Sequence, residues 1–222
     1  MEFRALRTAE ELAALPRFER LVWDGEEDLV PVSMLVSVVR EGGLALAAYD
    51  GDELVATSFA FPTHEREVLH SHYIAVHPDR RGAGLGEAIK RRQADWCREH
   101  GYEAMRWTFD PLQLANAHLN LNKLGAFGVE YHTDLYGALG GINGTLPSDR
   151  LTVQWWFDRP RPSFAESLVV PVPPATPQQI AASSTEAFTA RLAVRDALAP
   201  HLADGWVVAG VDREARTYTL SR

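Results

Sequence analysis

Three glycines alternate with other residues in the segment Arg81-Gly82-Ala83-Gly84-Leu85-Gly86. The run before this segment has the pattern of a strand, and the residues from about Leu85 to His100 have the pattern of a helix. Glycine lets backbone N–H groups turn toward one point, and the first turn of a helix adds unpaired N–H groups and the positive end of its dipole. Such a loop favours an anion, and we expect a phosphate or pyrophosphate there.

Two common nucleotide-binding motifs explain this loop poorly. A mononucleotide P-loop requires Gly-Lys-Ser/Thr, whereas Glu87 stands where the neighbourhood should be basic. A dinucleotide fingerprint requires GxGxxG in a parallel βαβ unit, whereas the glycines here read GxGxG and follow a hairpin. A glycine-rich turn that binds no ligand is the plain alternative.

Two histidines precede the glycine loop on the strand expected from Val68 to Val76. Side chains alternate along a strand, so His70 and His72 should share one face. Imidazole titrates near neutral pH and can take a proton from an amine nucleophile. We therefore interpret both residues as candidate catalytic bases, with hydrogen-bonded or exposed strand residues as the alternative.

The glycine loop resembles the acyl-CoA signature of the GNAT superfamily. That signature reads Gln or Arg, two variable residues, Gly, one variable residue, then Gly or Ala, and Arg81, Gly84 and Gly86 meet it. The expected order of elements from residue 2 to about 157 is also similar. The resemblance implies an N-acyltransferase with acetyl-CoA, succinyl-CoA or a similar acyl-CoA as cosubstrate. It further implies direct attack by a primary amine, with no metal and no covalent enzyme intermediate.

The same resemblance implies roles for particular residues. The backbone amides of residues 81–86 would bind the CoA pyrophosphate, and Asn116 could hydrogen-bond the pantetheine amides. The strand that would pair with the pantetheine arm consists of Ile74, Ala75 and Val76. The superfamily often places a glutamate base about eleven residues before the loop's first residue, and that position is His70. At the position of Leu121, many members carry a tyrosine that protonates the leaving thiolate. A leucine cannot donate a proton, and Tyr131 and Tyr136 could be the donors instead.

Four short segments are similar to those of one bacterial GNAT subgroup, some members of which accompany N-acylamino-acid racemases and o-succinylbenzoate synthases. The segments are Leu69-His70-Ser71-His72, Trp107-Thr108-Phe109-Asp110-Pro111, Asn116-Ala117-His118-Leu119-Asn120 and Pro147-Ser148-Asp149-Arg150-Leu151.

The subgroup resemblance implies a small-molecule amine as substrate, such as an amino acid. A cation should then receive the substrate carboxylate, and Arg150 or Arg106 could supply it. His118 and Asn120 are further candidate substrate residues, and Asn120 is one helical turn from Asn116 on the same face. Ordinary salt bridges are the alternative for both arginines. A non-catalytic acyl-CoA or metabolite-binding module, and acylation of a protein amine, remain alternative functions.

The order of the expected strands and helices predicts an α/β (α+β) fold, which would position these residues. It has a mixed, mainly antiparallel central sheet flanked by helices, and a C-terminal helix-plus-hairpin extension. Thr8 and Glu11 form a capping box that begins a helix, which Pro16 should kink or split. Asp50-Gly51-Asp52 predicts a hairpin between strands 44–49 and 54–61.

Beyond the central helix we expect further elements and a second, smaller domain. The expected strands are 104–109, 127–133 and 151–157, with a helix over 112–124 and a loop over 137–147. Prolines from residue 160 to 177 mark a stiff tether. We therefore place a boundary near residue 158, dividing a catalytic domain, 1–158, from a lobe, 159–222. A helix near 178–202 and a hairpin of 205–211 and 216–220 could complete a sheet in the same subunit or in a homodimer.

The composition favours small-molecule chemistry. The 222 residues are 46% hydrophobic, and the formal net charge of −8 gives no broad attraction to nucleic acid or anionic lipid. Neither a membrane span nor a secretory signal is evident, so we expect a cytoplasmic protein. Cys97 falls within a helix as a small buried residue, and no metal-ligand spacing occurs among the histidines.

Overall fold

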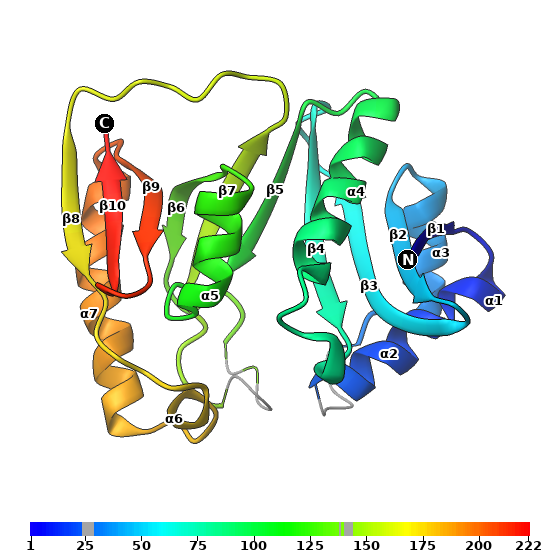
Figure 1. Cartoon of the computed structure of the whole chain (residues 1–222), viewed down its shortest axis with the longest axis horizontal. Helices are drawn as coiled ribbons and strands as arrows, with labels where there is room; N and C mark the ends of the chain where they lie inside the picture. The colour runs from blue at the N-terminus through cyan, green and yellow to red at the C-terminus, as the bar shows by residue number, and fades with distance from the viewer. Residues whose placement is uncertain (24–28, 138, 140–143) are drawn as a thin grey trace. The chain divides into compact units, whose positions relative to one another are not determined.

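The computed structural model describes residues 1–23, 29–137, 139 and 144–222 (Figure 1). The chain forms two compact units, Met1–Arg106 and Trp107–Arg222, and the boundary between them falls within strand β5 (Ala104–Phe109). The two compact units thus divide elsewhere than near residue 158. The domain boundary near residue 158 stays a prediction.

The first unit is built on a sheet in the order β1-β2-β3-β4-β5, to which β5 contributes its first residues. Its other strands are β1 (Glu2–Leu6), β2 (Leu44–Asp50), β3 (Glu53–Pro62) and β4 (Val68–Val76). Neighbouring strands are antiparallel except β4 and β5, which are parallel. The predicted hairpin is confirmed: Gly51 adopts a φ of +61° at its turn, which favours glycine.

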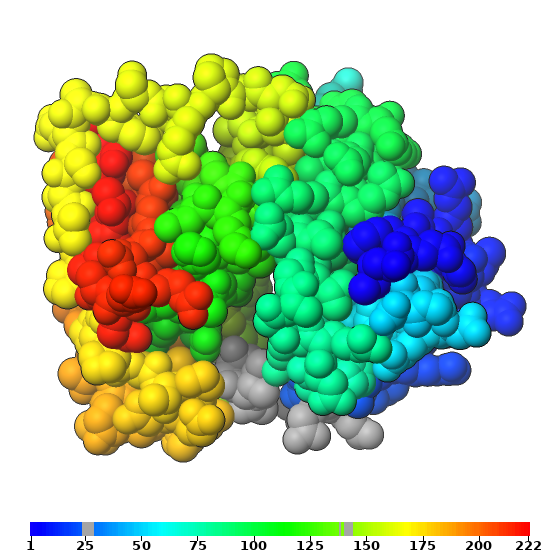
Figure 2. Space-filling model, viewed as in Figure 1, coloured from blue at the N-terminus to red at the C-terminus, as the bar shows by residue number. Residues whose placement is uncertain are grey.

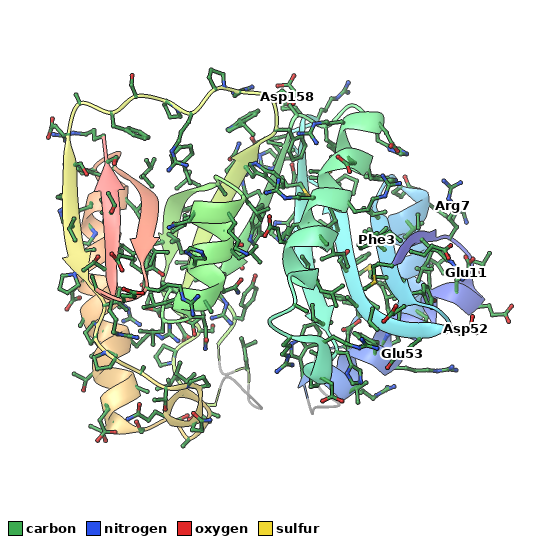
Figure 3. The ribbon with its side chains drawn as sticks, viewed as in Figure 1. Phe3, Arg7, Glu11, Asp52, Glu53 and Asp158 are labelled. Carbon is green, nitrogen blue, oxygen red and sulfur yellow. The ribbon has the colours of Figure 1, made fainter. Side chains whose placement is uncertain are left out.

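The helices of this unit are α1 (Ala9–Leu12), α2 (Ala14–Trp23), α3 (Val32–Arg40), the 3-10 turn η1 (Pro78–Arg80) and α4 (Leu85–Glu99). The capping box is confirmed, because Thr8 Oγ1 accepts from the Glu11 N–H at 3.2 Å and Glu11 Oε2 accepts from the Thr8 N–H at 2.9 Å. Figure 3 labels Glu11. The expected split is also present, and Pro16 lies in the first turn of α2.

Apolar side chains from these helices meet the sheet in one core. Leu12, Leu15, Leu35 and Phe59 are buried in a single cluster, so α1, α2 and α3 cover the face of β3 that carries Phe59. Burial of large apolar side chains supplies most of the stability of such a layer. The opposite face of β3 and β4 meets α4.

The second unit continues from β5 through the order β7-β6-β9-β10-β8. Its strands are β6 (Phe127–His132), β7 (Arg150–Trp156), β8 (Ser167–Pro171), β9 (Val207–Asp212) and β10 (Thr217–Ser221), and its helices are α5 (Leu114–Ala117), the π-helix η2 (His118–Lys123), α6 (Pro177–Ala181) and α7 (Thr185–Ala203). Helix α7 packs on β6, β8 and β9.

Two features of this unit differ from the sequence-based expectation. The helix expected over 112–124 changes to a π-helix from His118, in which each N–H bonds the carbonyl five residues earlier. Gly125, with a positive φ, follows its end. The proline-rich tether also contains a strand, β8, whose Leu168, Val169 and Val170 pair with β10. The expected terminal hairpin is confirmed in β9 and β10. Residues 138 and 140–143 of the expected loop 137–147 lie outside the described residues.

The strand pairings give a mixed, mainly antiparallel sheet with helices packed against it, as the sequence predicted. Among the described residues, no helix combines the length and the apolar character needed to cross a membrane.

Candidate active site

The glycine loop joins the end of β4 to the start of α4. Gly82 and Gly84 adopt φ values of +80° and +83°, in the left-handed region that favours glycine, and Gly84 is the N-cap of α4. A Cβ at either glycine would meet no atom within 4 Å. The loop is exposed, and the first N–H groups of α4 have no partner within the helix. Here the backbone can approach an anionic ligand closely, with the helix dipole favouring negative charge.

Two arginines fix the segment that leads into the loop. Arg80 contacts Asp50 at 3.2 Å and Glu53 at 2.7 Å, at the turn between β2 and β3, where Figure 3 labels Asp52 and Glu53. Arg81 Nη2 donates to the carbonyl of Val22 at 3.3 Å, near the carboxyl end of α2. The Arg81 side chain therefore supports α2 as well as the loop.

A β-bulge interrupts β4 beside its histidines. The register pairs Phe59 with Tyr73 but Ala60 with Ser71, so His72 is the extra residue of the bulged strand. As a result, Tyr73 is returned to the face that carries Phe59, beside α2, while Ser71 faces α4. The sequence could not locate this bulge, because neither proline nor glycine marks it.

His70 and His72 lie on the same face of β4, as strand alternation predicts. The His70 ring stacks on Phe61 with centroids 4.7 Å apart, and the His72 ring lies 5.7 Å from Phe61 and 6.3 Å from His70. Burial lowers the pKa of His70 to about 4, assisted by His72, Lys90 and Arg106. His70 is therefore neutral at pH 7 and a weak base.

Desolvation by the aromatic rings packed around it also lowers the pKa of His72. Because the residue is exposed at the surface, we expect this effect to be weaker than at His70. His72 is accordingly the stronger base of the two histidines.

Glu19 lies in α2, on the helical layer that packs against the bulge, and sequence reasoning missed it. The Tyr73 hydroxyl donates a hydrogen bond to Glu19 Oε1 at 2.7 Å, and the Glu19 side chain is buried. Burial raises the pKa of Glu19, against the hydrogen bonds from Tyr73 and from the Val30 backbone. The sequence signal was a lone carboxylate among the apolar positions of an amphipathic helix.

Thr57 brings a third polar group to this face. Its hydroxyl is fully buried and has no hydrogen bond of normal geometry among the described residues, although it acts to lower the pKa of Tyr73. Its strand neighbour across the ladder is Ala75, which packs on Phe18 and Val22 of α2. This face of β4 therefore combines aromatic walls with a few polar groups.

The other face of β4 is held by a polar cluster beneath α4. Lys90 Nζ donates to Ser71 Oγ at 2.8 Å, Ser71 Oγ donates to Gln93 Oε1 at 3.0 Å, and Gln93 Nε2 donates to Ser58 Oγ at 3.1 Å. All four residues are buried, and burial lowers the pKa of Lys90. These bonds tie the helix that follows the glycine loop to the strand that precedes it.

Asn116, His118 and Asn120 belong to the second unit. Asn116 is exposed, whereas Asn120 is 1% exposed and accepts from the Trp107 indole at 3.2 Å. The two asparagines, which we expected one helical turn apart on one face, thus differ in burial, and Asn120 has a partner in Trp107.

His118 lines a hollow of about 660 Å³ in this unit. Its other lining residues are Asn122, Val211, Asp212, Arg213 and Glu214. In Figure 2 the red-orange atoms of the turn between β9 and β10 lie beside the green atoms of α5 and η2. The amide of Asn122 both donates to and accepts from the backbone of Val211.

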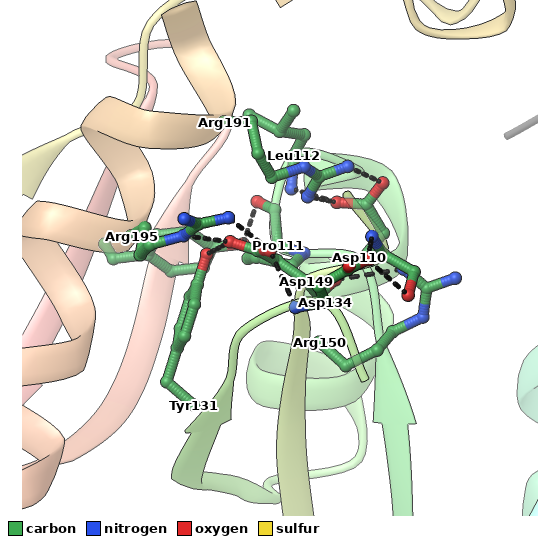
Figure 4. Close-up of polar contacts among 11 residues, drawn as sticks. Asp110, Pro111, Leu112, Tyr131, Asp134, Asp149, Arg150, Arg191 and Arg195 are labelled. Atoms are coloured by element: carbon green, nitrogen blue, oxygen red, sulfur yellow. Dashed lines mark hydrogen bonds and ion pairs between the residues drawn. The ribbon is translucent and has the colours of Figure 1, made fainter. Parts of the chain in front are cut away.

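Arg150 lies at the edge of a charged network in the second unit (Figure 4). Arg191 pairs with Asp110, and Arg195 pairs with Asp149. Arg150 instead donates to the Asp149 carbonyl at 2.9 Å and covers the Tyr136 ring, 5.6 Å from its centroid. Within the described ranges no ion pair is recorded for Arg150, so its guanidinium keeps the capacity to bind a carboxylate.

The other candidates are engaged in structural contacts. Arg106 forms a bidentate ion pair with Glu65, at 2.8 and 3.1 Å. This contact fits the alternative that Arg106 forms an ordinary salt bridge. Tyr131 donates to Asp149 at 2.7 Å, and Tyr136 is bonded to Thr108 at 3.2 Å.

Cys97, the one cysteine of the sequence, lies in α4. Cys97 is buried, and burial raises the pKa of its thiol to about 12, which opposes a nucleophilic role. In that part of the chain no group of three or more His, Cys, Asp or Glu side chains could hold a metal ion.

Comparison with known families assigns the fold. Residues 9–125, more than half of the chain, match the model of the acetyltransferase (GNAT) family. The chain therefore belongs to this family. A search of curated proteins gave no match.

Solved structures agree with that assignment. The ribosomal-protein-S18-alanine N-acetyltransferase from Escherichia coli aligns with a TM-score of 0.58 and 17% identity, over 72% of this chain and 95% of that chain. The yncA structure from Salmonella typhimurium, with its cofactor acetyl-CoA, gives 0.58 and 17%, over 75% and 99%. The ribosomal-protein-alanine N-acetyltransferase from Brucella melitensis gives 0.57 and 18%, over 71% and 100%. At these identities the likeness shows the fold alone.

The glycine loop fits the phosphate end of an acyl-CoA. Its left-handed glycines leave open space where a Cβ would stand, and the amides at the start of α4 are available to an anion. Family membership thus supports N-acyl transfer from acyl-CoA, with acetyl-CoA as the family's cosubstrate.

Proposed function

We propose that this protein transfers an acetyl, succinyl or similar acyl group from acyl-CoA to a primary amine of a small molecule. The observation that carries the proposal is the sequence β4, bulge, glycine loop and α4, in which a histidine-bearing strand leads directly into an anion cradle. When bound, the acyl-CoA supplies the activated thioester. The protein supplies binding, orientation and removal of a proton from the amine.

In this proposal the cradle holds the CoA pyrophosphate through the amides of residues 81–86. Ile74, Ala75 and Val76 lie on β4 between the bulge and the loop, which suits pairing with the pantetheine arm. Asn116 stays a candidate for contacting the pantetheine amides.

His72 is the base that we favour, with His70 as the second candidate. The two rings lie together, but the neutral imidazole of His70, with a pKa of about 4, holds a proton too weakly to be well matched to neutral pH. His72 is the exposed residue of the bulge, and it can reach solvent-borne substrate.

An amino acid is the substrate class that we favour for the amine. Arg150 supports this choice because the other two arginines of its network have carboxylate partners, while the described residues provide it with none. His118 lines the hollow of the second unit and stays a candidate substrate residue. The relation to the subgroup that accompanies N-acylamino-acid racemases, with succinyl transfer, belongs to the same proposal.

Thiol release tests the proposed reaction. Purified protein is incubated with acetyl-CoA or succinyl-CoA and a panel of amino acids and simple amines, and free CoA thiol is measured. We expect amine-dependent release with at least one acyl-CoA. Binding of acyl-CoA without release for any amine would favour the non-catalytic binding module, which the buried Leu121 at the position of the family's usual tyrosine also favours.

A base variant sharpens the assignment. His72→Ala should lower kcat/KM by about 100-fold, because a positioned base contributes about that much, while His70→Ala should have the smaller effect. The pH profile of kcat/KM should contain no limb near pH 6.5 from His70, which is neutral above about pH 4. A larger loss in His70→Ala than in His72→Ala would reverse the assignment.

A matched pair of glycine variants tests the cradle. Gly84→Ala and Gly101→Ala each place a side chain on a residue with a φ near +80°, and neither Cβ would meet an atom within 4 Å. Both should therefore lose about 1 kcal/mol of stability. Calorimetric titration with CoA should show weaker binding only for Gly84→Ala. Equal CoA affinity in the two variants would count against the cradle.

A further inference from the structure

We propose that Glu19 and Tyr73 form a positioning pair that holds the β4 bulge, and with it the imidazole of His72, in the arrangement that acyl transfer requires. This inference rests on the proposed function, and it assigns a role to a buried carboxylate far from the loop in sequence.

The bulge decides where Tyr73 lies. In an uninterrupted strand, Tyr73 would alternate with His72 and would face α4. The extra residue in β4 instead pairs Tyr73 with Phe59, on the side of α2. His72 and Tyr73 therefore lie next to each other on one face, with ring centroids 6.0 Å apart. A bulge disrupts the local hydrogen-bond ladder, so its geometry has to be held by other contacts.

Two contacts from α2 hold Tyr73 in this position. Its hydroxyl donates to Glu19 Oε1 at 2.7 Å, and its ring meets the edge of Trp23 with centroids 5.3 Å apart at 88°. The hydroxyl and the ring are thus fixed by residues one helical turn apart on the same helix. The Tyr73 ring in turn forms one wall of the space around the His72 imidazole, opposite Phe61 and beside Phe59.

Stability alone explains Glu19 poorly. Its side chain is 2% exposed, and the ion pairs recorded for the described residues do not include it. Arg20 contributes only the weakest of the favourable interactions with this carboxyl, so its burial is costly and an apolar residue would pack better at this position of α2. Within the described part of the chain, its side-chain hydrogen bond is to the tyrosine of the bulge. We therefore infer that the carboxylate is retained because it orients Tyr73.

Steady-state kinetics with four variants test the pair. With the amine and acyl-CoA that give wild type its highest turnover, Tyr73→Phe and Glu19→Ala should lower kcat about tenfold, with the KM for acyl-CoA within about twofold. Glu19→Gln should keep at least half of kcat, because its carbonyl oxygen still accepts from Tyr73. Tyr102→Phe, which removes the hydroxyl bonded to Gly42 in the same unit, should match wild type.

Histidine NMR supplies a readout that does not depend on turnover. The ring ¹⁵N signals of His72 should shift in Tyr73→Phe and in Glu19→Ala, and should stay at their wild-type positions in Tyr102→Phe. If Glu19→Ala does not fold, Tyr73→Phe and Glu19→Gln decide the question.

The outcomes separate this inference from the proposed function. Wild-type kcat and unchanged His72 signals in Tyr73→Phe would overturn the positioning role. Loss in Glu19→Gln as large as in Glu19→Ala would overturn positioning through the hydrogen bond. If wild type releases no thiol, the proposed function fails, while the His72 signals still report whether the pair holds the bulge.

Discussion

Each unit of the molecule contains a buried carboxyl that accepts a hydrogen bond from a tyrosine at 2.7 Å, yet the two carboxyls differ in proton affinity. Asp149 binds Tyr131, and Glu19 binds Tyr73. Burial acts to raise the pKa of both. At Asp149 the hydrogen bonds from Arg195 and Tyr131 outweigh burial and lower the pKa, whereas burial dominates at Glu19 and raises it.

The arginine is the difference between the two sites. Arg195 places both its Nε and Nη2 at 2.8 Å from the Asp149 oxygens, and the backbone of Asp134 adds a third donor at 3.1 Å. Glu19 accepts hydrogen bonds from Tyr73 and one backbone N–H, and Arg20 adds only a weaker coulombic attraction without an ion pair. A carboxylate in an ion pair stays ionised at neutral pH and fixes structure, whereas a buried carboxyl without an ion pair takes up a proton more easily.

Removing the charge should have opposite effects at the two carboxyls. Asp149→Asn should lower the free energy of unfolding at pH 7 by about 3 kcal/mol, because it breaks a buried ion pair from one side. Glu19→Gln should raise it by about 1 kcal/mol, because it removes the cost of a buried charge. Urea unfolding measures both, and equal signs would contradict the comparison.

The pH dependence of these two effects should also differ. The lowered pKa of Asp149 stabilises the fold above the unfolded value of 3.8, and this contribution is lost as pH falls through the folded pKa. The raised pKa of Glu19 destabilises the fold at neutral pH, so the gain from Glu19→Gln should vanish as pH falls from the folded pKa toward 4.5. Unfolding measured between pH 3 and pH 8 checks both directions.

Removing the arginine should make Asp149 resemble Glu19. Arg195→Met leaves Asp149 fully buried with Tyr131 and the Asp134 backbone as its partners. We expect a loss of about 2 kcal/mol at pH 7, smaller than for a fully buried pair because Arg195 is 24% exposed, together with a rise in the pKa of Asp149. Its carboxyl ¹³C titration reports the pKa, and an unchanged value would show that the arginine is not the cause.

The matched tyrosine variants should give the smallest effects. Tyr131→Phe should cost about 1.5 kcal/mol, because it removes a donor from a carboxylate that stays charged. Tyr73→Phe should cost less, about 0.5 kcal/mol, because Glu19 can take up a proton instead. Thermal unfolding at pH 7 compares them, and a larger loss for Tyr73→Phe would mean that Glu19 remains ionised.

Local sequence signals determined much of the first unit. The Thr8–Glu11 capping box, the Gly51 turn and the alternating glycines from Gly82 are short-range features, and each forms as predicted because the residues that make it are neighbours in the chain. Strand alternation likewise placed His70 and His72 on one face. The family resemblance that these signals supported is confirmed by the family match.

The tertiary structure decided what lies around those signals. The bulge at His72 depends on the register between β3 and β4, and the partner of Tyr73 comes from 54 residues earlier in the chain. The sequence did not predict strand β8 in the proline-rich segment, because its extended residues become a strand only by pairing with β10. In the same way, the sequence could not show which of the neighbours Asp149 and Arg150 is in an ion pair. Packing of α7 brings Arg195 to Asp149, whereas the Arg150 guanidinium donates to a backbone carbonyl.

The sequence by itself thus determined the glycine loop at the start of α4, because such a loop needs only its own backbone. Which carboxyls are fixed anions, which can exchange a proton, and which side of β4 carries Tyr73 were decided by the tertiary structure. The physical reason is that burial and long-range hydrogen bonds set proton affinity, and both depend on residues that meet only after the chain has folded.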